Sequence, residues 1–152
     1  KLDSLINNKG SKSVDYFHKK LGKIMWNKCG MARNKKDLES AISEISKLRK
    51  EFWKEVKVPG DQNEFNEELA KAGRVADFLE LGELFAKDAL EREESCGGHF
   101  REEYQTKEGE ATRKKEFQFV SAWEYVGEPR DAILHKENLE YKNIEVKERS
   151  YK

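Results

Sequence analysis

Three long stretches of the chain repeat apolar residues at steps of three and four positions, and this periodicity limits the possible folds most strongly. The stretches begin near Ser13, Asn34 and Gln62. Such spacing places the apolar side chains on one face of an α-helix. Val58-Pro59-Gly60 separates the second stretch from the third, because proline disfavours helix in the residue before it. Three helices with short connections predict an antiparallel three-helix bundle.

The third stretch, from about Gln62 to Glu94, predicts the longest and most central helix. Its apolar surface widens beyond a single stripe at Phe78 and Leu81, and a helix that is apolar on more than one side usually packs on more than one neighbour. Gly73 and Gly82 lie inside this helix. A glycine there costs about 1 kcal/mol relative to alanine. We therefore expect another element to approach the helix closely.

The periodicity changes in the last third of the chain. Residues 105–115 are polar and predict a loop. Glu116–Val126 has the two-residue period of a strand, with aromatic residues on one face (Phe117, Phe119, Trp123 and Tyr125) and Val120, Ala122 and Val126 on the other. A second strand is expected from about Asn138 to Glu148, with a change of phase near Asn143 that indicates a bulge. Together these segments predict a small C-terminal β-ribbon.

The patterns divide one domain into three parts. Residues 1–12 are polar and aperiodic and predict a leader or linker, residues 13–104 form the bundle, and residues 105–152 form the loop and ribbon. A length of 152 residues fits a single domain. The expected fold class is mainly α, an antiparallel three-helix bundle with a long central helix followed by the ribbon.

Composition excludes several classes of protein. No apolar run is long enough for a transmembrane helix, and no segment has the pattern of a secretory signal. A formal net charge of zero argues against a dedicated nucleic-acid binder. Two cysteines cannot form a disulfide framework, so reduced thiols in a cytosolic setting are expected. The chain begins with Lys1 and not Met, and we expect it to be part of a longer protein.

The charged residues are unevenly distributed along the chain, although the net charge is zero. Residues 1–60 carry 15 positive and 7 negative charges, whereas residues 61–110 carry 6 positive and 15 negative charges. Two segments of opposite sign can complement each other within the fold. Alternatively, one charged face docks on a partner, as in a freestanding adaptor that binds another protein through opposed basic and acidic faces.

The stretch 94–104 is the most unusual chemically, because cysteine, histidine, arginine and carboxylates surround a Gly97-Gly98 turn. Cys96 and His99 have ligand-like spacing for a metal, with Glu102 or Glu103 as an oxygen donor, but the second ligand pair of a specific site is missing. The same cysteine and histidine could form a nucleophile and base, although no orienting third group is evident.

The interpretation that we favour for this stretch is structural. It is a hydrogen-bonded polar corner in which the two glycines adopt conformations that other residues avoid and Arg101 bridges carboxylates. Elsewhere the chain lacks glycine-rich nucleotide-binding loops, the nucleophile-elbow motif and the zinc-protease motif. The residues alone therefore assign no catalytic, cofactor-binding or metal-binding side chain.

The order of several motifs resembles a known family. Glu94-Ser95-Cys96-Gly97-Gly98-His99-Phe100-Arg101 follows a long helix, as does the family hallmark Glu-Ser-(Arg/Cys)-Gly-(Ala/Gly)-His-x-Arg. The family is the C-terminal helical domain of the succinate dehydrogenase/fumarate reductase flavoprotein subunit, and the variant is most similar to a bacterial, Bacteroides-like type that is linked to menaquinone. The remaining matching segments are 21–26, 29–33, 71–81, 86–103, 122–125, 134–137 and 149–152.

This resemblance implies a part of an enzyme. The parent would be an oxidoreductase that interconverts succinate and fumarate, in which FAD passes electrons to an iron–sulfur subunit and then to quinone through a membrane anchor. The complex would lie at the cytoplasmic, inner face of the cell membrane. The motifs that bind FAD and the dicarboxylate belong to upstream domains, so the chain alone is expected to hold no cofactor and to be inactive.

The resemblance also implies a role for the polar corner. The domain would pack against its own upstream FAD-binding domain and help to seat the iron–sulfur subunit, without inserting into the membrane or binding nucleic acid. One departure is Lys114-Lys115, where the family pattern has acidic residues, and it leaves a partner contact by that loop in doubt. The candidate interdomain or intersubunit corner consists of Ser95, Cys96, Gly97, Gly98, His99, Arg101, Glu102 and Glu103.

Overall fold

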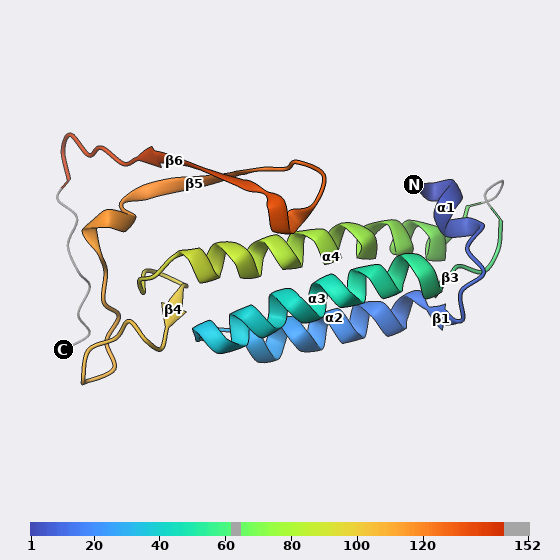
Figure 1. Ribbon diagram of the computed structural model, residues 1–152, viewed down its shortest axis with the longest axis horizontal. Coiled ribbons are helices and arrows are strands. Elements are labelled where there is room, and N and C mark those ends of the chain that lie inside the picture. The colour runs from blue at the N-terminus through green and yellow to red at the C-terminus, as the bar shows by residue number, and fades with distance from the viewer. Residues whose placement is uncertain (62–64, 145–152) are drawn as a thin grey trace.

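A computed structural model describes residues 1–61 and 65–144 and confirms the predicted fold class. The three long helices are α2 (Val14–Lys28), α3 (Lys35–Glu55) and α4 (Glu67–Glu91), and α3 runs antiparallel to the other two (Figure 1). Figure 1 shows them side by side, with the C-terminal ribbon lying along α4. Since α4 packs on both other helices and on the ribbon, it is the central helix of the domain.

Each long helix begins at a residue whose side chain caps its first turn. The Ser13 hydroxyl accepts from the amide of Tyr16, and the Asn34 side chain accepts from the amide of Asp37. These caps confirm the predicted starts of the first two helices. Asn66 caps α4 in the same way, and the start that we predicted near Gln62 lies outside the described residues.

The core lies between α2, α3 and α4 and contains mostly aliphatic side chains with two phenylalanines, Phe17 and Phe52, packed edge to face. Gly82 of α4 allows the close approach that we expected. A Cβ atom there would lie 3.4 Å from both Leu21 and Met25 of α2. Among the described residues, no helix combines the length and apolar character needed to span a bilayer.

The N-terminal segment differs from the predicted linker. Leu2–Ile6 form a short helix, α1, and Leu5 is fully buried in the core. β1 (Lys12–Ser13) then pairs in parallel with β3 (Val56–Lys57), which directly follows α3. A helix of a single turn contains too few residues to show a period of apolar positions, so its packing against the bundle could not be predicted from the sequence.

Pairing between distant segments also sets the ends of two helices, which stop before their apolar stripes do. The first apolar stripe extends to Ala32, but α2 ends at Lys28 because Ala32–Arg33 form β2 and pair in parallel with β4 (Phe100–Arg101). The second stripe extends to Val56, but α3 ends at Glu55, before the Pro-Gly break, because Val56 belongs to β3. In both places the last apolar residue of the stripe belongs to a paired strand and not to the helix.

The C-terminal ribbon contains β5 (Phe119–Glu124) and β6 (Ile133–Asn138), which pair antiparallel with Phe119 opposite Asn138. Short 3₁₀ turns precede them, η1 (Lys115–Phe117) and η2 (Pro129–Asp131). The alternation predicted for the first strand is confirmed, because Phe119 is buried and Ser121 and Trp123 are half-buried, whereas Val120, Ala122 and Glu124 are exposed.

The second predicted strand was placed too late in the sequence. β6 ends at Asn138, residues 139–144 form no strand, and residues 145–148 lie outside the described part of the chain. The bulge that we expected near Asn143 therefore does not lie in the ribbon. Pairing with β5 sets the position of β6, and Ile144, which suggested the later strand, is exposed.

Charged residues join the basic and acidic segments of the chain. Lys1 pairs with Asp77, and Lys71 pairs with Asp15. In the interior, Arg49 Nε of α3 lies 3.4 Å from a carboxylate oxygen of Glu83 of α4. These contacts support the interpretation that the two segments complement each other within the fold.

Candidate interdomain corner

The predicted corner lies at the end of the bundle where α4 stops and α3 begins (Figure 1). Residues Cys96 and His99 form a tight hairpin in which each backbone amide donates to the other's carbonyl, at 2.8 and 3.0 Å. Gly97 takes a positive φ of 58° in the turn, whereas Gly98 does not. A positive φ at the first central residue alone is typical of type II′ hairpins and favours glycine there.

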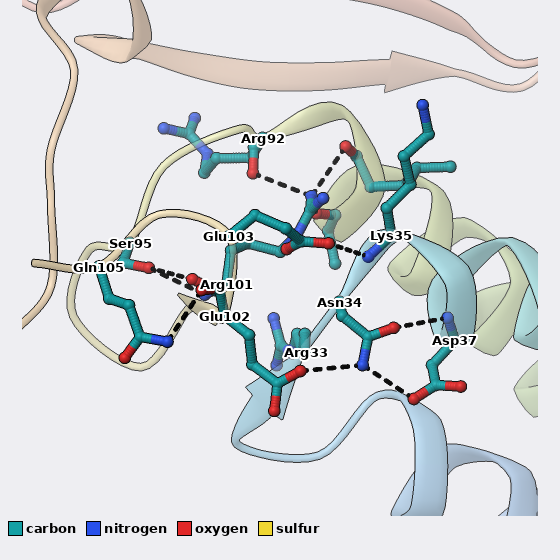
Figure 2. A network of polar contacts seen from close by, with 12 residues as sticks. Arg33, Asn34, Lys35, Asp37, Arg92, Ser95, Arg101, Glu102, Glu103 and Gln105 are labelled. Carbon is teal, nitrogen blue, oxygen red and sulfur yellow. Dashed lines mark hydrogen bonds and ion pairs between the residues drawn. The ribbon is translucent and has the colours of Figure 1, made fainter. Parts of the chain in front are cut away.

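Arg101 is the buried centre of the corner. Its guanidinium Nη1 donates to the carbonyl oxygens of Ala89 and Leu90, at 3.0 and 3.1 Å, and these are unpaired groups at the end of α4 (Figure 2). Its backbone amide donates to the hydroxyl of Ser95 at 2.8 Å, and that hydroxyl donates back to the Arg101 carbonyl. Because α4 has no basic residue in its last turn, Arg101 supplies the positive charge that a helix C-terminus favours.

Glu102 and Glu103 connect the corner to the start of α3. Asn34, the cap of α3, donates to the Glu102 carboxylate at 3.0 Å, and the amide of Lys35 donates to Glu103 (Figure 2). Burial opposes ionisation of Glu103, but hydrogen bonds from the Lys35 amide and the Arg101 guanidinium outweigh it and lower the pKa of this carboxyl. Carboxylates at a helix N-terminus are stabilised by its dipole.

His99 joins the corner to the loop between α2 and α3. Arg33 Nη1 lies 2.8 Å from His99 Nδ1, and His99 Nε2 lies 2.9 Å from the carbonyl oxygen of Arg92. A guanidinium only donates, so Nδ1 accepts and Nε2 carries the proton. Burial, together with the charges of Arg33, Arg101 and Arg92, lowers the pKa of His99. The imidazole is therefore a neutral bridge between the Arg33 side chain and the Arg92 carbonyl.

Glu94 and Arg92 attach the C-terminal tail to the same corner. The buried Glu94 carboxylate accepts from Arg92 at 2.9 Å and from the backbone amide of Lys114 at 3.0 Å. Arg92 also donates to the carbonyl oxygens of Phe117 and Phe119. The Lys114 ammonium, at a position where we expected acidic character, lies 4.3 Å from the centre of the Tyr104 ring.

This geometry bears on the chemical alternatives for Cys96 and His99. Both ring nitrogens of His99 are engaged, so neither is free to ligate a metal or to accept a proton from a thiol. Among the described residues, no group of three or more histidine, cysteine, aspartate or glutamate side chains could hold a metal ion. The contacts instead form a hydrogen-bonded polar corner, as we favoured, but two details of that prediction are wrong. Arg101 pairs with the carboxylate of Glu103 alone, at 3.1 Å, among the carboxylates of the described residues, and only Gly97 of the two glycines has a positive φ.

Sequence reasoning missed the partners of this corner. Arg33, Asn34 and Lys35 lie far from it in the sequence, and they reach it only because the α2–α3 turn meets the end of α4. The cap at Asn34 could be recognised, but nothing marked its contact with Glu102. The buried Arg49–Glu83 pair had no visible signal, because both residues occur in charged surroundings along the sequence.

Comparison with known proteins gives the same assignment as the motifs. The family described as fumarate reductase flavoprotein C-term matches residues 18–151. The fumarate reductase flavoprotein subunit of Haemophilus influenzae is 28% identical over 104 residues, which cover 68% of this chain and 17% of that protein. A CoM/CoB fumarate reductase subunit from Methanothermobacter marburgensis is 34% identical over 106 residues, which cover 66% and 19%.

Solved structures show the same fold. A quinol fumarate reductase chain from Escherichia coli superposes with a TM-score of 0.80 and 21% identity, over 95% of this chain and 24% of that chain. The Sdh1 complex of Mycobacterium smegmatis in its apo form gives 0.74 and 22%, over 94% and 23%. This chain thus spans less than a fifth of the two curated relatives above. Since the family match covers most of its length, the chain belongs to the family of fumarate reductase flavoprotein C-terminal domains.

Proposed function

We propose that the protein containing this domain is a flavoprotein oxidoreductase that interconverts succinate and fumarate. In it, FAD held by an upstream domain passes electrons to an iron–sulfur subunit. The observation that carries the proposal is the family match over residues 18–151, which includes most of α2, all of α3 and α4, and the corner. The fumarate reductase flavoproteins among the relatives support the choice of reaction.

The proposed role of the domain itself is structural. Ser95 and Arg101 are buried, and Arg101 binds the carbonyls at the end of α4, while Gly97 and Gly98 of the hairpin and Glu102 beyond it are exposed. Because buried hydrogen bonds already fix the backbone of the corner, its exposed edge loses little conformational entropy when it binds a partner. We assign this edge to contacts with the FAD-binding domain or the iron–sulfur subunit, in a complex attached to the inner face of the cell membrane.

The test uses the whole flavoprotein that contains this chain and, beside it, the 152 residues alone. The flavoprotein should contain FAD and support succinate-dependent dye reduction. The 152 residues should give a helical circular dichroism spectrum without flavin absorbance or dye reduction. Activity from the 152 residues alone would contradict the structural role. A parent protein that has no flavin-binding region would instead favour the adaptor with opposed charged faces.

A further inference from the structure

A mainly apolar groove runs between α2 and α4 and is lined by residues of these two helices alone. This α2/α4 groove is a hollow of about 270 Å³, and its lining includes His18, Gly22 and Met25 of α2 and Phe78, Leu81 and Phe85 of α4. Leu81 is 62% exposed, and Phe78 and Phe85 are each 44% exposed. Large apolar side chains gathered in this way on a highly charged surface mark a site of contact with another surface.

Gly22 is a second indication that the groove receives something. It lies in the middle of α2, where glycine costs about 1 kcal/mol relative to alanine. A Cβ atom at this position would meet nothing within 4 Å, unlike one at Gly82, which faces Leu21 and Met25. The packing within the domain therefore gives no reason for glycine at this position. A backbone or side chain that approaches α2 closely from outside would give one.

Arg33 adds a charge at one end of the groove. Its guanidinium lies over the ring of Phe85, 5.0 Å from the centroid, and both side chains line a neighbouring hollow of about 310 Å³. It donates to the carbonyls of Cys29 and Gly30 and to His99, and no carboxylate of the described residues forms an ion pair with it. The nearby Asp88 carboxylate is bound by the Trp123 indole at 2.8 Å. A partly buried cation with only neutral partners favours an incoming carboxylate.

We propose that the α2/α4 groove binds an apolar segment that carries one carboxylate, and that this carboxylate pairs with Arg33. The occupant is a segment of the flavoprotein region that precedes this domain, so the inference rests on the proposed function and refines its docking role. The choice of occupant follows from two observations. The groove is apolar with one unpaired cation at its end, and the curated relatives extend far beyond the part that this chain matches.

Cysteine labelling in the whole flavoprotein tests the proposal. In a Cys96→Ser background, Leu81→Cys places a thiol in the groove, and Lys47→Cys places one on the exposed surface of α3 as a control. Maleimide should label position 81 about tenfold more slowly than position 47, because a thiol under a docked segment reacts only when the contact opens. Equal rates at the two positions would overturn the proposal.

A steric variant identifies the occupant. Gly22→Leu places a side chain in the groove at a position where a Cβ atom meets nothing within 4 Å, so it should displace the docked segment and raise the labelling rate at position 81, whereas the control Lys23→Leu on the same helix should not. Arg33→Gln should raise the rate as well. Protection at position 81 that disappears on dilution would mean a second copy of the protein and would overturn the proposal.

The two hypotheses fail in different ways. A flavoprotein that reduces fumarate but labels freely at position 81 overturns the groove alone. A flavoprotein that is protected at position 81 but acts on neither succinate nor fumarate supports the groove and overturns the proposed reaction.

Discussion

Arg101 donates a hydrogen bond of 3.0 Å to the carbonyl oxygen of Ala89, so a residue beyond the hairpin closes the end of the helix that precedes it. The same guanidinium pairs with Glu103, which accepts from the first amide of α3. One buried side chain therefore links the end of α4 to the beginning of α3. This link explains why the stretch 94–103 is so rich in charge and glycine without forming a catalytic cluster.

Replacement of Arg101 by alanine should cost about 2–4 kcal/mol of unfolding free energy, because it leaves buried carbonyls of α4 without donors. Arg101→Lys should lower the unfolding free energy by less, since an ammonium retains the charge but lacks the planar set of donors of a guanidinium. Urea unfolding followed by circular dichroism measures the change. The control is Arg74→Ala, which removes an exposed arginine of α4 and should change the unfolding free energy by less than about 0.5 kcal/mol.

The two glycines of the hairpin should respond differently to alanine. Gly97→Ala should destabilise the domain by about 1 kcal/mol, because a side chain at positive φ is strained although the space around it is open. Gly98→Ala has the same open surroundings without the positive φ and should be nearly neutral. The urea midpoints of the two variants give the comparison. Equal destabilisation by both would mean that backbone conformation does not explain the glycine at position 97.

The N-terminal helix should contribute to stability although its sequence resembles a linker. Leu5→Ala removes a fully buried side chain and should cost about 2–3 kcal/mol. Leu2→Ala, in the same helix but 55% exposed, should have a much smaller effect. Thermal unfolding of both variants tests whether residues 1–12 belong to the folded domain. A Leu5→Ala variant as stable as the parent chain would restore the linker interpretation.

Acid should weaken the corner through His99. Its pKa is lowered in the folded chain by burial and by neighbouring arginines, so below the ordinary value of about 6.5 the unfolded chain binds a proton that the folded chain does not. Stability should therefore fall as the pH drops through this range and should be unaffected by this group at higher pH. His99→Gln should lower stability throughout and remove this part of the pH dependence. Urea unfolding at a series of pH values measures both effects.

Much of the bundle could be predicted from the sequence because its signals are local. Apolar spacing identified all three helices, and Ser13 and Asn34 marked two of their starts, since a cap involves only residues within one turn. The corner could be located in the same way, because its glycines and charged residues are consecutive. The family resemblance added the assignment that periodicity could not supply.

The remaining features depend on contacts between residues that are far apart in the sequence. The pairing of Ala32–Arg33 with Phe100–Arg101, the position of β6 opposite β5 and the burial of Leu5 all result from the way in which the helices pack. By itself the sequence determined the helices and the motif, because these depend on neighbours within one or two turns. Only the tertiary structure decided that Arg101 faces the α4 carbonyls and that the α2/α4 groove is left open, because both depend on how the helices meet in space.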